Sequence, residues 1–244
     1  GHEAKAIANN SSALGPYSSA SGVNSTAVGF KAEAVGIFSQ AIGTNATATG
    51  ACSIAIGKNA SASGTEAFAV GDRSSASERK TIAIGAEADA SGKTGAIAIG
   101  GSSIANKESS LALGYLAKAT GKQSIAVGVR SEATELHAIA LGCSAKATAS
   151  EAIAIGREAL ATGQSISIGA QAKSTGTDDI AIGRGATATS SQNSIAIGAA
   201  AFVSGSGKAV AIGEKAKSSG QNAYALGLDT QSTASDSFAI GTQA

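Results

Sequence analysis

The sequence has little of what builds a large apolar core. Among 244 residues there are no Met, no Trp, one Pro, five Phe and three Tyr, and only 14% of the residues are charged. The hydrophobic share of 43% is too high for a disordered chain, but much of it is Ala. This composition excludes a wide single core and argues against a conventional enzyme fold. It favours thin, repetitive packing, in which the length measures repeats rather than domains.

Charge and hydropathy exclude two further classes of function. The formal net charge is +1, from 18 Lys and Arg against 17 Asp and Glu. No long run of basic residues occurs, so nucleic acid is not an expected partner. No stretch of 18 apolar residues occurs either, so the sequence predicts no membrane-spanning helix and no membrane contact by this chain.

One five-residue pattern recurs along the whole chain. It ends in Gly preceded by Val, Ile or Leu, as in residues 53–57 (Ser-Ile-Ala-Ile-Gly). Of the sixteen intervals between successive pentads, twelve are 14 residues, three are 15 and one is 13, so the chain is a single repeat array. The pentads end at glycines 15, 29, 43, 57, 71, 85, 100, 114, 128, 142, 156, 169, 183, 198, 213, 227 and 241.

Each pentad predicts a β-strand, because β-branched residues alternate with Ala at period two. A second strand is predicted three to five residues after each Gly. There, two small residues flank an outward position that is polar in thirteen of sixteen coils. We expect the Ile and Val pair of the pentad to face the small pair of the second strand, since large against small fills a thin roll. The opposite parity is possible but packs less well.

Stacking these coils at about 4.8 Å gives an all-β fold, a parallel β-roll or β-solenoid of about 17 coils of roughly 14 residues. The pentad glycines are expected to take positive φ at the turns, so Gly57→Val or Gly128→Val should misfold its coil. With Ile and Val inside, the Ser and Ala face of the pentad strand remains uncovered. Such a long apolar stripe predicts an oligomer.

Pentads such as residues 124–128 (Ser-Ile-Ala-Val-Gly), repeated at 14-residue spacing, resemble the YadA-like head domains of trimeric autotransporter adhesins. The resemblance covers nearly the whole chain. It implies a left-handed roll and an intertwined or side-by-side homotrimer. It also implies a coiled-coil stalk and a β-barrel anchor in a Gram-negative outer membrane. Handedness and threefold symmetry come from the resemblance alone.

The expected organisation is an N-terminal extension or cloning remnant over residues 1–10, followed by a single head domain over residues 11–244. The chain begins Gly1-His2 and ends at Ala244 without heptads, so the export signal, stalk and anchor are expected to lie outside this sequence.

Chemical motifs are sparse. His2 and His137 have no acid or thiol around them at a spacing typical of a catalytic or metal site. Cys52 and Cys143 lie six coils apart, too far to pair within one chain. A bridge between symmetry-related chains is the alternative to a small buried thiol. The segment around Lys93 lacks the first Gly of a phosphate-binding loop. We expect no enzymatic activity, no cofactor and no metal.

Candidate binding residues are those that break the repeat. Ile104, Leu160 and Phe202 are apolar at the outward position of the second strand, and Tyr17 and Leu116 lie in exposed turns. The lengthened coils at residues 93–94, 185–192 and 204–208 form loops that include Lys93 and Lys208. An incidental exposed side chain is the competing interpretation for each of them.

The predicted function is non-catalytic, multivalent attachment at the bacterial cell surface, as the exposed head of an outer-membrane protein. The resemblance implies binding to host extracellular matrix proteins or glycoprotein receptors, contact with like adhesins on neighbouring cells, biofilm formation and a role in virulence. Alternatives are a structural fibre or surface-layer module, and an ice-binding solenoid. The latter needs a regular Thr ladder, which the outward positions lack. An enzyme would need clustered carboxylates or a His in a cleft.

Overall fold

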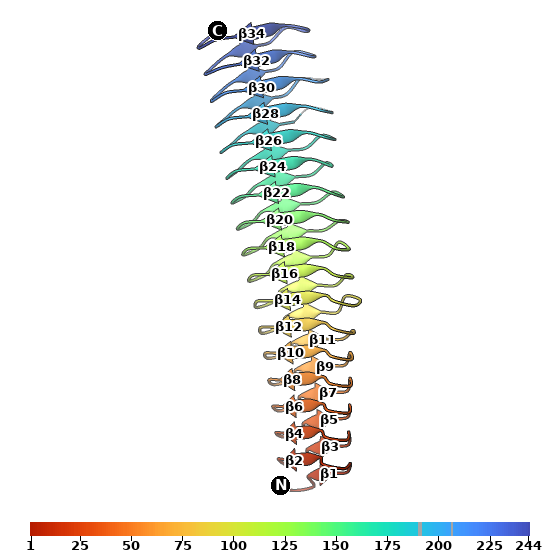
Figure 1. Ribbon diagram of the computed structural model, residues 1–244. Helices are drawn as coiled ribbons and strands as arrows, with labels where there is room; N and C mark the ends of the chain where they lie inside the picture. The colour runs from red at the N-terminus through yellow and green to blue at the C-terminus, as the bar shows by residue number, and fades with distance from the viewer. Residues whose placement is uncertain (190–191, 206) are drawn as a thin grey trace. The chain divides into compact units, whose positions relative to one another are not determined.

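The computed structural model describes residues 1–189, 192–205 and 207–244. It divides the chain into two compact units, residues Gly1–Gln123 and Ser124–Ala244. Every regular element in the described residues is a strand, and each unit stacks the strands coil after coil (Figure 1). No helix in this described part is long and apolar enough to cross a membrane. The predicted parallel β-solenoid of about 17 coils is therefore confirmed.

Three-residue strands, which we call pentad strands, lie in the predicted pentads. In the first unit they are β2 (Ser12–Leu14), β4 (Thr26–Val28), β6 (Gln40–Ile42), β8 (Ile54–Ile56), β10 (Phe68–Val70), β12 (Ile82–Ile84), β14 (Ile97–Ile99) and β16 (Leu111–Leu113). In the second unit they are β18 (Ile125–Val127), β20 (Ile139–Leu141), β22 (Ile153–Ile155), β24 (Ile166–Ile168), β26 (Ile180–Ile182), β28 (Ile195–Ile197), β30 (Val210–Ile212), β32 (Tyr224–Leu226) and β34 (Phe238–Ile240).

Two-residue strands, which we call short strands, follow the pentad glycines. In the first unit they are β1 (Lys5–Ala6), β3 (Ser19–Ala20), β5 (Glu33–Ala34), β7 (Thr47–Ala48), β9 (Ser61–Ala62), β11 (Ser75–Ala76), β13 (Asp89–Ala90), β15 (Ile104–Ala105) and β17 (Lys118–Ala119). In the second unit they are β19 (Glu132–Ala133), β21 (Lys146–Ala147), β23 (Leu160–Ala161), β25 (Lys173–Ser174), β27 (Thr187–Ala188), β29 (Phe202–Val203), β31 (Lys217–Ser218) and β33 (Gln231–Ser232).

Equivalent positions of successive coils stack directly on one another. Pentad strands pair in parallel only with pentad strands, so that Ile54 aligns with Phe68 and Phe68 with Ile82. Short strands likewise pair with short strands, as Ser61 with Ser75. The 15-residue interval does not disturb this register, because Ile82 still aligns with Ile97. The additional residue is accommodated in the turn.

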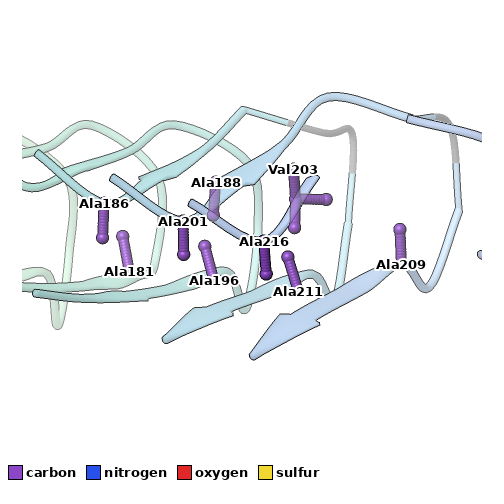
Figure 2. Close-up of a cluster of buried hydrophobic side chains, with 9 residues drawn as sticks. All are labelled: Ala181, Ala186, Ala188, Ala196, Ala201, Val203, Ala209, Ala211 and Ala216. Atoms are coloured by element: carbon purple, nitrogen blue, oxygen red, sulfur yellow. The ribbon is translucent and has the colours of Figure 1, made fainter. Parts of the chain in front are cut away.

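The inside of the roll is lined by Ala and Ser, which reverses the predicted parity. Ser53 and Ala55 of the pentad face inward and are fully buried, as are Ala60 and Ala62 of the same coil's second half. Ile54 and Ile56 point outward and are only half-buried. In the second unit the interior Ala side chains of the two sheets point toward each other across a narrow gap (Figure 2).

The physical reason is the separation of the two sheets. Two short turns within 14 residues hold the strands so close that nearly all the side chains between them are the methyl and hydroxymethyl groups of Ala and Ser. Among the described residues the largest fully buried side chain is Val203, which aligns with Ala188 of the preceding coil. The prediction that Ile and Val fill the interior was wrong, and the exposed stripe consists of Ile and Val rather than Ser and Ala.

Two separate constraints require Gly at the end of each pentad. Gly57 has φ +132° and Gly128 has φ +130°, a region that side chains rarely adopt. A Cβ built on Gly57 would lie 2.5 Å from the carbonyl oxygen of Gly71 in the next coil. The predicted positive φ is confirmed, and close stacking adds a second restriction.

Each regular coil also turns at residues in the left-handed region. Asn24, Asn45 and Asn59 have φ of 53–57°, which Asn tolerates because its side chain can bond locally. Successive turns of the same corner stack such side chains: Asn10 Nδ2 donates a hydrogen bond to Asn24 Oδ1 at 3.1 Å, and Asn45 Nδ2 donates one to Asn59 Oδ1 at 3.2 Å. The turns thus form ladders of side chains along the corners of each unit.

Candidate functional site

Four surfaces of the roll present side chains to the outside: the outward face of the pentad sheet, the outward face of the short-strand sheet, and the two corners. The first corner follows the pentad Gly, and the second follows the short strand. Each is described within a single unit.

We call the outward side of the pentad sheet the apolar face. Its side chains are half-buried or exposed in the isolated chain. In the first unit the stripe from β8 to β16 comprises Ile54, Ile56, Phe68, Val70, Ile82, Ile84, Ile97, Ile99, Leu111 and Leu113. In the second unit it comprises Ile125, Val127, Ile139, Leu141, Ile153, Ile155, Ile166, Ile168, Ile180, Ile182, Ile195, Ile197, Val210 and Ile212 from β18 to β30.

Continuous stripes of this kind are large for a monomeric soluble protein, and mark a surface that another protein covers. Neither stripe carries a charged side chain to interrupt it. The arrangement can therefore bind a second apolar surface, but it offers no acid, base or nucleophile.

The short-strand face is polar and carries ion pairs between neighbouring coils. Lys146 Nζ lies 3.1 Å from a carboxylate oxygen of Glu132 on the adjacent strand. Three predicted candidates interrupt this polarity. Ile104 in β15, Leu160 in β23 and Phe202 in β29 are half-buried and point outward.

These three candidates do not form one site. Ile104 lies in the first unit, between Asp89 and Lys118. Leu160 and Phe202 share a face of the second unit but are separated by the strands of Lys173 and Thr187. The Nζ of Lys217 lies 6.0 Å from the centre of the Phe202 ring, within cation–π range.

The other turn candidates lie at the corners. Tyr17, at φ 58°, is 43% exposed and packs edge-on against Phe30 with ring centres 5.8 Å apart. The ring of His2 lies 5.4 Å from that of Tyr17. Leu116 also has φ 58° and is half-buried. The packing of Phe30 and of His2 against Tyr17 was not predicted from the sequence. The 14-residue register contained a signal for the first contact, because it places Phe30 one coil beyond Pro16, the residue next to Tyr17.

Lys93 lies at a hollow on the second corner of the first unit. The hollow has a volume of about 480 Å³ and is lined by Ser91, Lys93, Asn106, Lys107, Glu108 and Lys122. Sequence reasoning identified only Lys93 among them. The sequence does hold a signal for the hollow: Lys107 occupies the position at which the preceding coil has Gly92 and the following coil has Gly121.

Lys208 is exposed on the second corner of the second unit. The two other lengthened coils, at residues 185–192 and 204–208, include residues 190, 191 and 206, which lie outside the described residues. No candidate assembly of side chains can be built around them.

Cysteine and metal chemistry give no site. Cys52 and Cys143 are free and exposed at corners, so the expectation of small buried thiols was wrong. They occupy turn positions rather than the interior Ala or Ser positions. Across residues 1–189, 192–205 and 207–244 no group of three or more His, Cys, Asp or Glu side chains could hold a metal ion.

The repeats of the chain match a family model, the YadA head domain repeat. Thirteen matches, most of them overlapping, span residues 1–60, 62–88, 90–159, 161–186 and 190–244. The chain belongs to the YadA head family. No curated protein matches the sequence.

Membership of the YadA head family gives the chain an adhesin-type role at the cell surface. Its heads are in general non-catalytic, and the extended apolar and polar faces of this roll are surfaces on which a protein partner can bind. The YadA head thus presents an apolar face on the pentad sheet and a polar face on the short-strand sheet.

Proposed function

We propose that this YadA head forms a homotrimer through its apolar face and attaches bacteria to host extracellular matrix proteins or cell-surface glycoproteins through its remaining surfaces. The half-exposed Ile and Val stripe is the observation that carries the proposal. Its burial contributes about 25 cal/mol per Å² of apolar surface, and every coil adds to the total. Membership of the YadA head family supports the threefold symmetry.

Multivalency strengthens attachment by such a trimer. Three copies of every binding surface act together, so weak contacts sum to a much higher overall affinity. The polar short-strand face and the corners stay available when the apolar face is covered. The same surfaces on neighbouring cells support autoaggregation and biofilm formation. An anchored outer-membrane protein would display this head away from the cell.

Binding of the trimer to immobilised collagen, fibronectin and laminin, and to epithelial cells, tests the function. We expect saturable binding to at least one of these surfaces. A variant that carries Ile56→Asp and Ile84→Asp, and is therefore monomeric, should bind with at least tenfold lower apparent affinity. If the trimer binds none of the matrix proteins or cells, and beads coated with it do not aggregate, the proposal is contradicted and a structural fibre module is favoured.

A further inference from the structure

The hollow on the second corner of the first unit gathers positive charge from three successive coils. Lys93, Lys107 and Lys122 contribute three ammonium groups, and Glu108 contributes the only carboxylate in the lining. Lys122 Nζ lies 3.0 Å from a carboxylate oxygen of Glu108, so this carboxylate is already engaged. Among the described residues Lys93 and Lys107 have no ion-pair partner.

The hollow arises from two departures from the repeat. The 15-residue interval adds a residue next to Lys93, and Lys107 occupies a position that Gly92 and Gly121 fill in the adjacent coils. A Cβ on Gly92 would clash with the Lys107 backbone, so the two coils are in direct contact. Gly92 and Gly121 have no side chains, so the exposed Lys107 side chain has no equivalent in the two adjacent coils.

The backbone around the hollow is held by hydrogen bonds between coils. The Gly92 amide donates to the Ala105 carbonyl at 3.1 Å, and the Ser109 amide donates to the Thr94 carbonyl at 3.2 Å. Ser110 Oγ donates to the Lys107 carbonyl at 2.7 Å. The positions from which the three lysines extend are therefore fixed before a ligand binds, which lowers the entropic cost of binding.

We propose that this hollow binds the sulfate groups of a sulfated polysaccharide. This inference rests on the proposed attachment function and names a ligand for it. Unpaired ammonium groups favour a permanently charged anion, and charge-assisted hydrogen bonds to sulfate oxygens are strong. Ser91 and Asn106 add a hydroxyl and an amide that can bond to sugar hydroxyls.

A peptide ligand fits this site less well. All six lining side chains are polar or charged, whereas peptide recognition depends on apolar anchors in buried pockets. The three lysines come from successive coils about 4.8 Å apart, so a linear chain lying along the corner can contact all of them. A polysaccharide with repeated sulfates has this form.

Heparin oligosaccharide is the probe, measured by surface plasmon resonance with the full 244-residue chain. Lys93→Ser combined with Lys107→Gly removes the two unpaired charges, and Gly is the residue that both adjacent coils have at the position of Lys107. We expect at least tenfold weaker heparin binding. Lys58→Thr combined with Lys118→Ser is the matched control, since it removes the same charge elsewhere in the unit and should leave binding within twofold of wild type.

When wild type binds heparin, three results would still overturn the inference. They are equal heparin binding by the hollow variant and wild type, equal losses in both double variants, and binding of hyaluronan, which carries carboxylates only, as tightly as heparin. If wild type fails to bind heparin but still binds matrix proteins, the inference fails and the proposed function stands. If it binds neither, both fail.

Discussion

Ala55 and Ile56 are neighbours in β8 but face opposite sides of the pentad sheet: the Ala55 side chain is fully buried inside the roll, and the Ile56 side chain is half-buried on the outside. This alternation defines the molecule. Small side chains hold the two sheets together, and larger apolar side chains are left for another protein to cover.

Aspartate substitutions at these two residues should have opposite effects. Ala55→Asp places an unpaired charge between the sheets and should destabilise the fold by several kcal/mol. Ile56→Asp should leave the isolated chain folded and weaken self-association. Circular dichroism melting and light scattering separate the two effects, and Ser61→Asp on the polar face is the neutral control. Unfolding of an Ile56→Asp chain at high dilution would contradict the assigned orientation.

Much of the fold is predictable from the sequence, because period and strand positions follow from the pentads. The parity was mispredicted, although a signal for it exists. Positions equivalent to Ser53 and Ala55 hold small residues or Asp179, whereas the position of Ile54 also accepts Gln40 and Tyr224. A close-packed interior tolerates little variation in size, so the uniformly small positions are the interior ones.

The binding surfaces were predictable only in part. The lengthened coil identified Lys93, but the hollow depends on how Lys107 and Lys122 align across coils in which one interval is 15 residues. That alignment requires the stacked register. The edge-on packing of Tyr17 on Phe30 likewise arises from stacking and not from proximity in the sequence.

Gly57→Ala should destabilise the fold by about 3 kcal/mol or more. It combines a strained φ with overlap between the new Cβ and the Gly71 carbonyl oxygen. Gly185→Ala is the matched comparison, because Gly185 has φ 67° and no atom within 4 Å of a built Cβ. We expect it to cost about 1 kcal/mol. Urea unfolding measures the free energy of unfolding of both variants. Equal losses of stability would show that the close stacking on Gly71 adds nothing to the cost.

Asp179→Ala should destabilise the second unit. The buried carboxylate accepts hydrogen bonds from the Gly176 and Ser194 amides, each at 2.9 Å. Removing it leaves buried donors unpaired, at a cost of about 1–3 kcal/mol for each. Asp178→Asn is the control, since Asp178 is exposed at φ 58°, where Asn is well tolerated. Similar melting temperatures for the two variants would refute this role of Asp179.

Three buried hydroxyls in the coil of β24 and β25 should show strong non-additivity. Ser174 Oγ donates to Ser165 Oγ at 2.8 Å and lies 2.6 Å from Ser167 Oγ. Ser174→Ala alone should cost about 1 kcal/mol, because it leaves the other hydroxyls with fewer partners. Replacing all three by Ala should recover that loss, since the preceding coil has Ala154 and Ala161 at the aligned positions. Additive losses in denaturant melts would refute the network.

The absolute mass in solution, measured by light scattering behind a sizing column, tests the central claim most directly. If the apolar face is buried between chains, the wild-type protein has a mass close to three times 23.3 kDa at every concentration at which it is folded. A folded species of 23.3 kDa that persists at high concentration would contradict the account, because the Ile and Val stripe would then remain exposed to water.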